Sequence, residues 1–176
     1  MTRAFIGIGS NLTPEENIRE ALRRLAQSTR LVSISTFYRQ PAIGRPEEPD
    51  FYNGVVAIDT DLPPAKLKWE VLRPIEAALG RRRSADKYAS RTIDLDLLLY
   101  GDSVLSSNQL TLPDPDILRR AFIAVPLYEI SPALMLPGSG HPIRQIAERF
   151  GRQSMQPLHE YTRQLQNELL AGQKSL

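Results

Sequence analysis

The segment from Arg91 to Tyr100 limits the fold most strongly, because it has the pattern of a strand with two aspartates on one face. It contains threonine, isoleucine and leucine around Asp94 and Asp96, it lacks glycine and proline, and a Gly101-Asp102 turn signal follows it. Side chains alternate between the two faces of a strand. We therefore expect the two aspartates on one face with Leu98 and Tyr100, and the other face to carry Ile93, Leu95, Leu97 and Leu99.

Two carboxylates side by side repel each other, and cations between them remove that repulsion. Oxygen ligands on a rigid strand suit Mg²⁺, which completes its shell with water and substrate phosphates. The segment just upstream, GRRRSADKYASR at residues 80–91, holds five basic residues and one acid, whereas the whole chain has a net charge of +2. Metal ions and guanidinium groups together bind polyphosphates. The alternative is an exposed basic loop followed by aspartates that face solvent.

Length and composition predict one soluble domain. The chain has 176 residues, 41% of them hydrophobic and 24% charged, which is enough for a core of ordinary composition. It has no cysteine, so disulfides, zinc-thiolate sites and catalytic thiols are excluded. No apolar run approaches the ~20 residues of a membrane span, and the N-terminus lacks a signal-peptide pattern. We expect a cytoplasmic monomer that binds neither membrane nor nucleic acid, with a domain over residues 1–155 and a helical tail over 156–176.

Hydrophobic periodicity predicts the order strand, helix, strand, strand, helix, strand. The strands are expected at 3–9, 31–38, 51–60 and 92–100, the first two helices at 14–27 and 63–79, and further helices at 117–130, 142–150 and 158–171. This order is that of an α+β, ferredoxin-like antiparallel sheet. The glycines at 7 and 9 do not fit a dinucleotide-binding fingerprint, because Leu12 stands where a third glycine is needed. We expect them to allow a close approach of neighbouring groups.

Five motifs together resemble the 6-hydroxymethyl-7,8-dihydropterin pyrophosphokinase family. The first is the Asp94/Asp96 strand with its basic loop, and the others are AFIGIGSNL at 4–12, STFY at 35–38, PDFYNG at 49–54, and RAF at 120–122 with PLYEISP at 126–132. The resemblance covers about residues 1–150. It implies a three-layer fold with helices on both faces of the sheet. It also implies transfer of the diphosphoryl group of ATP to the hydroxymethyl group of the pterin in folate biosynthesis, with release of AMP.

The resemblance also assigns roles to residues of this chain. Two Mg²⁺ ions would be held by Asp94 and Asp96, and the triphosphate would be bound by Arg81, Arg83, Lys87 and Arg91. The pterin would lie among Gln40, Pro41, Ala42, Ile43, Gly44, Phe51, Asn53 and Phe122. Glu76, Thr111, Asp114 and Arg120 would contact the nucleotide. Taken singly, the phenylalanines are better explained as core residues, Glu76 is equally well explained as a solvated acid of a helix, and Arg120 could be a surface charge.

Some positions differ from the usual pattern of the family. Tyr88-Ala89-Ser90 stands in place of Trp-Gly-Pro, Gln109 in place of a frequent arginine, and Asp114-Pro115 in place of a histidine and an aromatic residue. An acid near phosphate predicts weaker ATP binding than a histidine does. A paralogue with altered substrate or little catalysis is therefore a second hypothesis, and a ferredoxin-like RNA-binding domain a third. From the polar composition of the tail, we expect a chain that ends near residue 155 to stay folded and active.

Overall fold

The computed structural model describes residues 1–151 and 155–171. The strands are β1 (Thr2–Ser10), β2 (Arg30–Ile34), β3 (Tyr38–Gln40), β4 (Phe51–Thr60), β5 (Asp94–Tyr100), β6 (Leu105–Ser106), β7 (Thr111–Leu112) and β8 (Gln156–Pro157). The α-helices are α1 (Pro14–Ser28), α2 (Pro64–Lys66), α3 (Arg73–Ala78), α4 (Ala121–Ile130), α5 (Ile143–Phe150) and α6 (His159–Leu169). A π-helix, η1 (Leu67–Leu72), joins α2 to α3, and a 3₁₀-helix, η2 (Pro115–Leu118), precedes α4. In the described ranges, no helix combines the length and the apolar character that crossing a membrane requires.

The main sheet is antiparallel and has β1 near its centre. The strand order is β5-β1-β4-β3-β8, and β2 pairs with β4 beyond the end of β3. The expected α+β, ferredoxin-like pattern is confirmed, because the chain runs β-α-β-β-α-β and the last main strand, β5, lies beside the first. The expected single strand at 31–38 is instead two strands, β2 and β3. Between them Phe37 turns into the core, where it packs against Gly54 of β4.

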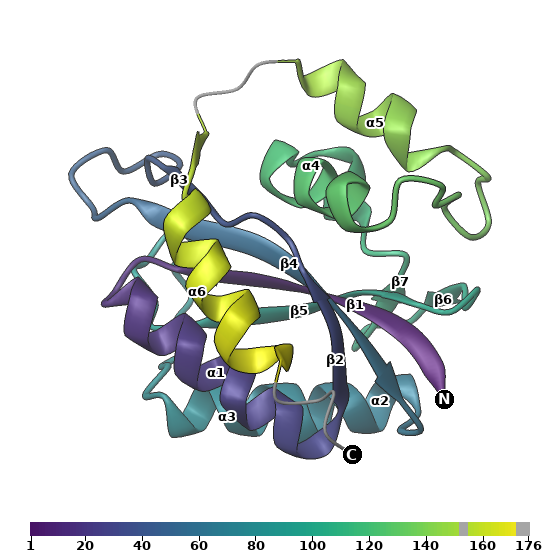
Figure 1. The fold of residues 1–176 in the computed structure, drawn as a ribbon, viewed down its shortest axis with the longest axis horizontal. Coiled ribbons are helices and arrows are strands. Elements are labelled where there is room, and N and C mark those ends of the chain that lie inside the picture. The colour runs from purple at the N-terminus through teal and green to yellow at the C-terminus, as the bar shows by residue number, and fades with distance from the viewer. Residues whose placement is uncertain (152–154, 172–176) are drawn as a thin grey trace.

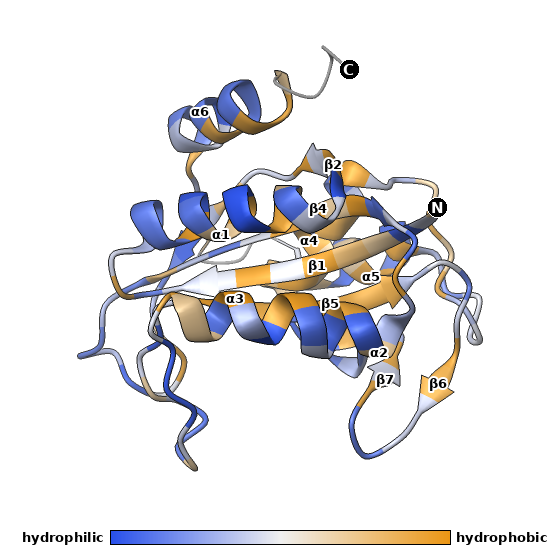
Figure 2. Cartoon of the chain, turned by 90° about the horizontal axis from the view of Figure 1, so that it is seen from below, coloured by the Kyte–Doolittle hydropathy of each residue, from blue (hydrophilic) through white to orange (hydrophobic). Residues whose placement is uncertain are grey.

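Helices cover both faces of this sheet, which gives the expected three layers (Figure 1). One face packs against α1, the helix from α2 to α3, and α6, and the other face packs against α4 and α5. In Figure 2 the outward side of α1 is largely hydrophilic, the helix from α2 to α3 is mixed, and the strands behind them carry many hydrophobic residues. Two hydrophobic cores therefore fix β1, β4 and β5 from opposite sides, and the ends of these strands form a rigid edge for a site.

The register of β5 shifts by one residue beyond the aspartates. Leu97 pairs with Ile6 and Leu99 with Phe5, so one residue, Leu98, is extra on the β5 side. Because of this bulge, Leu99 joins Leu98 in the core under α4. The expectation that Leu99 shares a face with Leu95 and Leu97 is therefore wrong. The two aspartates precede the bulge and keep the expected alternation.

The C-terminal segment packs closely against the domain. Tyr161, Leu165 and Leu169 of α6 are buried in the same core as α1. The Tyr161 hydroxyl donates to the carbonyl oxygen of Glu15 at 2.9 Å, and the backbone N–H of Phe37 donates to Oγ1 of Thr162 at 2.9 Å. Removing α6 would expose this part of the core. We therefore no longer expect a chain that ends near residue 155 to keep its stability, and we propose that the segment is part of the domain.

Thr162→Val tests this docking with little change of shape. The variant is expected to lower the free energy of unfolding by about 1–3 kcal/mol, because the buried N–H of Phe37 loses its acceptor. Chemical denaturation followed by circular dichroism measures this change. Gln164→Ala, at an exposed position of α6, is the matched control and should have the stability of the wild type. Equal stability of Thr162→Val and wild type would contradict a structural role for the segment.

Candidate active site

Asp94 and Asp96 lie at the edge of the sheet where β1 ends and β5 begins. Asp94 pairs with Gly9 and Asp96 with Gly7. On the other side of β1, Asn53 of β4 pairs with Gly9 and is buried. A Cβ atom added to Gly9 would lie 2.7 Å from Oδ1 of Asn53. The expected close approach is thus confirmed at Gly9, since a glycine there leaves room for the Asn53 amide beside the aspartates.

The Asp94 carboxylate is neutralised by two arginines of the basic loop. Nη1 of Arg81 donates to Oδ1 of Asp94 at 2.6 Å, and Nη1 of Arg91 donates to Oδ2 at 3.1 Å. All three side chains are largely buried, with exposed fractions of 24% for Asp94, 10% for Arg81 and 20% for Arg91. The structure thus brings the basic loop and the aspartate strand into direct contact, while the expected binding of a polyphosphate stays a prediction. Arg81 and Arg91 therefore lie on the side of Asp94 where we expect cationic groups that bind phosphate.

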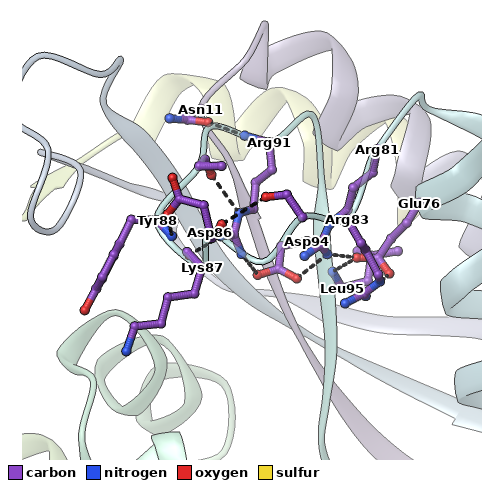
Figure 3. Close-up of polar contacts among 12 residues, drawn as sticks. Asn11, Glu76, Arg81, Arg83, Asp86, Lys87, Tyr88, Arg91, Asp94 and Leu95 are labelled. Atoms are coloured by element: carbon purple, nitrogen blue, oxygen red, sulfur yellow. Dashed lines mark hydrogen bonds and ion pairs between the residues drawn. The ribbon is translucent and has the colours of Figure 1, made fainter.

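Glu76 forms the centre of a buried charge cluster, called here the Glu76 cluster (Glu76, Arg73, Arg81 and Arg83). Its carboxylate accepts hydrogen bonds from Arg73 and Arg81, from Arg83 at 3.0 Å, and from the N–H of Leu95 at 3.3 Å. Figure 3 shows Arg81 and Arg83 converging on Glu76 beside Asp94. The Glu76 side chain is only 3% exposed. The expected nucleotide contact is thus at most indirect, and Glu76 instead orients the arginines and the start of β5.

Asp96 has an environment quite unlike that of Asp94. Among the residues that the structure describes, its carboxylate forms no hydrogen bond or ion pair, although it is partly exposed to the cavity. Burial, followed by repulsion from Asp94 and Asp114, raises the pKa of Asp96 to about 8. The ionised form of this carboxylate has no ion-pair partner among the described residues, so a bound cation would stabilise it.

A cavity of about 270 Å³ opens beside the two aspartates. It brings together most of the residues expected around the pterin, namely Gln40, Pro41, Ile43, Phe51, Asn53 and Phe122. Lys87, Tyr88, Arg91 and Arg120 line it as well. Ala42 and Gly44 do not line it, and Ala42 is buried beneath the loop. One part of the cavity thus contains the rings of Phe51 and Phe122 and the buried amide of Asn53, and the other part is lined by charged residues.

The two loops beside this cavity are tied together by polar contacts. Arg45 forms an ion pair with Asp86, and the Ser90 hydroxyl donates to Glu48. Asn11 joins both loops to β1, because its Nδ2 donates to the Ser90 hydroxyl at 3.0 Å and its Oδ1 accepts from the N–H of Arg91 at 2.8 Å. Asn11 therefore holds the start of the aspartate strand against the end of β1. Figure 3 shows Asn11 beside Arg91.

The other expected nucleotide contacts do not form one cluster. Thr111 is exposed on β7, whereas Arg120 lines the cavity with Phe122. Asp114 has a partner of its own, because its Oδ1 accepts from the N–H of Asp116 at 2.8 Å and caps η2. Burial raises the pKa of Asp114. Arg73 was not predicted from the sequence, although its spacing of three residues from Glu76 on a helix was a usable signal.

Asp114→Asn is expected to bind ATP about threefold more tightly than the wild type does. The reason is the loss of a screened repulsion of ~0.6 kcal/mol between the Asp114 carboxylate and the phosphates. Asparagine keeps the cap of η2, whereas Asp114→His also loses it, so the histidine variant should gain less. Calorimetric titration with Mg²⁺ and ATP measures both dissociation constants. Weaker binding by Asp114→Asn would show that this carboxylate assists the nucleotide.

Within residues 1–151 and 155–171, no group of three or more His, Cys, Asp or Glu side chains is arranged to hold a metal ion. The candidate metal ligands are therefore the two aspartates. Mg²⁺ is often held by one or two carboxylates together with water and substrate phosphates, so this pair fits that ion. The histidines, His141 and His159, are exposed as expected.

A family model described as 7,8-dihydro-6-hydroxymethylpterin-pyrophosphokinase matches residues 5–132. The chain is 40% identical over 158 residues to the 2-amino-4-hydroxy-6-hydroxymethyldihydropteridine pyrophosphokinase of Haemophilus influenzae, with 88% of this chain and 97% of that protein covered. It is 40% identical over 143 residues to the enzyme of the same name from Pseudomonas aeruginosa, with 79% and 86% covered.

Solved structures show the same fold. A crystal structure of Plasmodium falciparum HPPK-DHPS aligns with a TM-score of 0.63 at 14% identity. The alignment covers 85% of this chain but only 44% of the Plasmodium chain. This structural likeness supports the fold and, at such low identity, nothing further.

Proposed function

This chain belongs to the 7,8-dihydro-6-hydroxymethylpterin-pyrophosphokinase family, and we infer that it transfers the diphosphoryl group of ATP to 6-hydroxymethyl-7,8-dihydropterin. The hydroxymethyl oxygen forms a bond to the β-phosphorus, and the bond from that phosphorus to the α,β-bridging oxygen breaks. AMP leaves with the bridging oxygen, and the hydroxyl proton passes to solvent. The reaction is a step of folate biosynthesis. The comparisons give no support to the hypothesis of a divergent, weakly active paralogue.

The observation that carries this proposal is the position of the Asp94/Asp96 pair between an aromatic cavity and a cluster of arginines. When bound, two Mg²⁺ ions at these aspartates would neutralise phosphate charge and polarise the substrate hydroxyl. The chain itself supplies no strong general base beside the aspartates among its described residues. Positioning and electrostatics are therefore expected to account for most of the rate.

The cationic residues bind and orient the triphosphate. Arg81 and Arg91 already point at the carboxylate edge, so phosphate oxygens can replace Asp94 as their acceptors without a large movement. Arg83 is held by Glu76 but remains 56% exposed, which leaves donors free for a ligand. Nζ of Lys87 lies 5.0 Å from the centre of the Tyr88 ring at the cavity wall. These four residues are proposed to stabilise charge on the transferred and leaving groups.

The aromatic part of the cavity is proposed to hold the pterin. Phe51 and Phe122 offer two faces for a flat ring, and the Asn53 amide offers a donor and an acceptor to its edge. Gln40, Pro41 and Ile43 close the side of the cavity. Loop 39–50 is tied to loop 80–91, so both are expected to settle together when the substrates bind.

We further propose a cytoplasmic monomer that acts on these two small molecules and binds no nucleic acid. The decisive experiment measures AMP by a coupled assay with ATP, Mg²⁺ and the hydroxymethylpterin. AMP should form only when all three are present, and EDTA should stop its formation. AMP released at the same rate without the pterin would contradict the proposed substrate, and no AMP under any condition would contradict the activity.

A further inference from the structure

The helix that precedes the basic loop is interrupted by the π-helix η1 at residues 67–72. A π-turn inserts one extra residue into a helix, and such turns often occur at functional sites. Here η1 contains Lys68 and Trp69, and α3 follows it with Arg73 and Glu76 of the Glu76 cluster. The segment with the irregular turn therefore lies directly beside the charged end of the site.

Lys68 reaches from this helix to the hairpin of β6 and β7. Its Nζ donates a hydrogen bond to the backbone carbonyl of Gln109, in the turn that joins the two strands. The same Nζ lies 4.9 Å from the centre of the Trp69 ring. The Lys68 side chain is half-buried, and Trp69 is 48% exposed. The ammonium group is thus held at a defined place by two neutral partners.

The charged groups around Lys68 indicate which side of the site lies near it. Burial and the nearby Arg73 lower the pKa of Lys68, whereas Asp96 and Asp114 act to raise it. Neither of these two carboxylates forms an ion pair with a described residue. By contrast, Asp94 already has Arg81 and Arg91. Lys68 therefore places positive charge near Asp96 and Asp114, with which the arginines of the basic loop form no ion pair.

Lys68 can also exchange its hydrogen-bond acceptor, the Gln109 carbonyl, for a phosphate oxygen. A hydrogen bond from an ammonium to a phosphate oxygen is roughly twice as strong as one between neutral groups, and the Gln109 carbonyl carries no charge. Arg73, the other cation near Asp96, is committed to Glu76 and to the carbonyl of Leu95 at 3.1 Å. Lys68, unlike Arg73, can move to an incoming anion without breaking an ion pair with a described residue.

We propose that Lys68 is a nucleotide-binding residue that leaves the Gln109 carbonyl and donates to the phosphate of the AMP moiety on the Asp96–Asp114 side of the site. The inference rests on the proposed function, because it takes ATP as the nucleotide. Thr111 and Asp114, expected from the sequence to contact the nucleotide, lie on the same side, on or just after β7. The phosphate nearest this side therefore belongs to the leaving nucleotide.

Lys68→Met keeps the length of the side chain and removes its charge. The variant is expected to bind ATP and AMP at least about tenfold more weakly in calorimetric titrations with Mg²⁺ and without pterin, the effect of losing one charge-assisted hydrogen bond. Lys68→Arg should restore most of the affinity. Lys66→Met, at an exposed position of the same helix, is the matched control and should bind like the wild type.

Trp69 gives a second measurement that does not depend on activity. It is the one tryptophan of the chain, and the Lys68 ammonium lies against its ring. Adding AMP or ATP should change its fluorescence in the wild type and in Lys66→Met, because the ammonium moves away, and should change it little in Lys68→Met.

The outcomes separate this inference from the proposed function. Wild-type affinity for ATP and AMP in Lys68→Met, with or without lower thermal stability, would overturn the inference, because Lys68 would then only tie the helix to the hairpin. A loss of ATP affinity with unchanged AMP affinity would overturn its placement at the AMP phosphate. If the wild type forms AMP in a pterin-dependent manner in either case, the proposed function still stands.

Discussion

Replacing Asp94 or Asp96 with asparagine is expected to lower the rate of AMP formation by at least about 10²-fold, the scale of losing one electrostatic group at a transition state. Each variant keeps the shape of the strand edge but removes a charge that the proposed Mg²⁺ ions require. Initial rates at saturating ATP and pterin, measured over a range of Mg²⁺ concentrations, test the prediction. Asp102→Asn, in the exposed turn after β5, is the matched control and should retain wild-type rates.

The two variants should differ in the stability of the metal-free protein. Asp94→Asn loses ion pairs to Arg81 and Arg91 and should be less stable, whereas Asp96→Asn removes a buried charge whose burial and repulsion outweigh its attraction to Arg73, and should be more stable. The pKa of Asp96 is raised from 3.8 to about 8, so the folded wild type loses stability as the pH rises through that range. The advantage of Asp96→Asn over wild type should therefore grow between these pH values.

Denaturation in EDTA at several pH values measures this difference. Near-normal Mg²⁺-dependent activity in both asparagine variants would show that the metal site lies elsewhere. A lower stability of Asp96→Asn at every pH would show that Asp96 has a stabilising partner in the folded protein.

Replacing Glu76 with alanine is expected to lower the free energy of unfolding by about 3–5 kcal/mol, because it leaves the largely buried side chains of Arg73 and Arg81 without their shared carboxylate. The rate of AMP formation should fall as well, since Arg81 and Arg83 lose the group that orients them. Chemical denaturation gives the first quantity, and kcat at saturating substrates gives the second.

Two variants serve as controls for this prediction. Glu76→Gln keeps an acceptor for the N–H of Leu95 and should lie between wild type and alanine in stability. Glu70→Ala, on the exposed side of the same helix, should leave both stability and rate unchanged. If Glu76→Ala proves as stable as Glu70→Ala, then the arginines find other partners and the carboxylate does not organise the cluster.

The sequence allowed the fold class and the centre of the site to be predicted, because both depend on local patterns. The apolar alternation around Asp94 and Asp96 and the neighbouring run of arginines were visible within about twenty residues. The ion pairs of Arg81 and Arg91 with Asp94 were not predicted, because the sequence pattern assigned these arginines to the triphosphate. Long, strongly periodic elements such as β1, β4 and α1 were also predicted close to their observed bounds.

What the sequence left open depends on contacts between distant segments. The bulge at Leu98 arises from the fit of β5 to β1, and the turn of Phe37 into the core depends on Gly54 of another strand. Glu76 could be read as a solvated acid, because only the folded chain brings Arg81 and Arg83 back over the helix. The apolar stripe of α6 was visible in the sequence, but only the folded chain shows that it packs into the same core as α1.

The position of β1 between β4 and β5 affects how the protein folds while it is synthesised on the ribosome. Gly9 of β1 pairs with Asn53 of β4 and with Asp94 of β5, so the first strand to be synthesised has to wait for both of its neighbours. At about 5–20 residues per second, that interval lasts several seconds. Meanwhile the apolar edge from Ala4 to Ile8 is unpaired on the side of β5, and α6, which completes the core, is synthesised later still. The nascent chain is therefore most open to misassociation before Asp94 and Asp96 have left the exit tunnel.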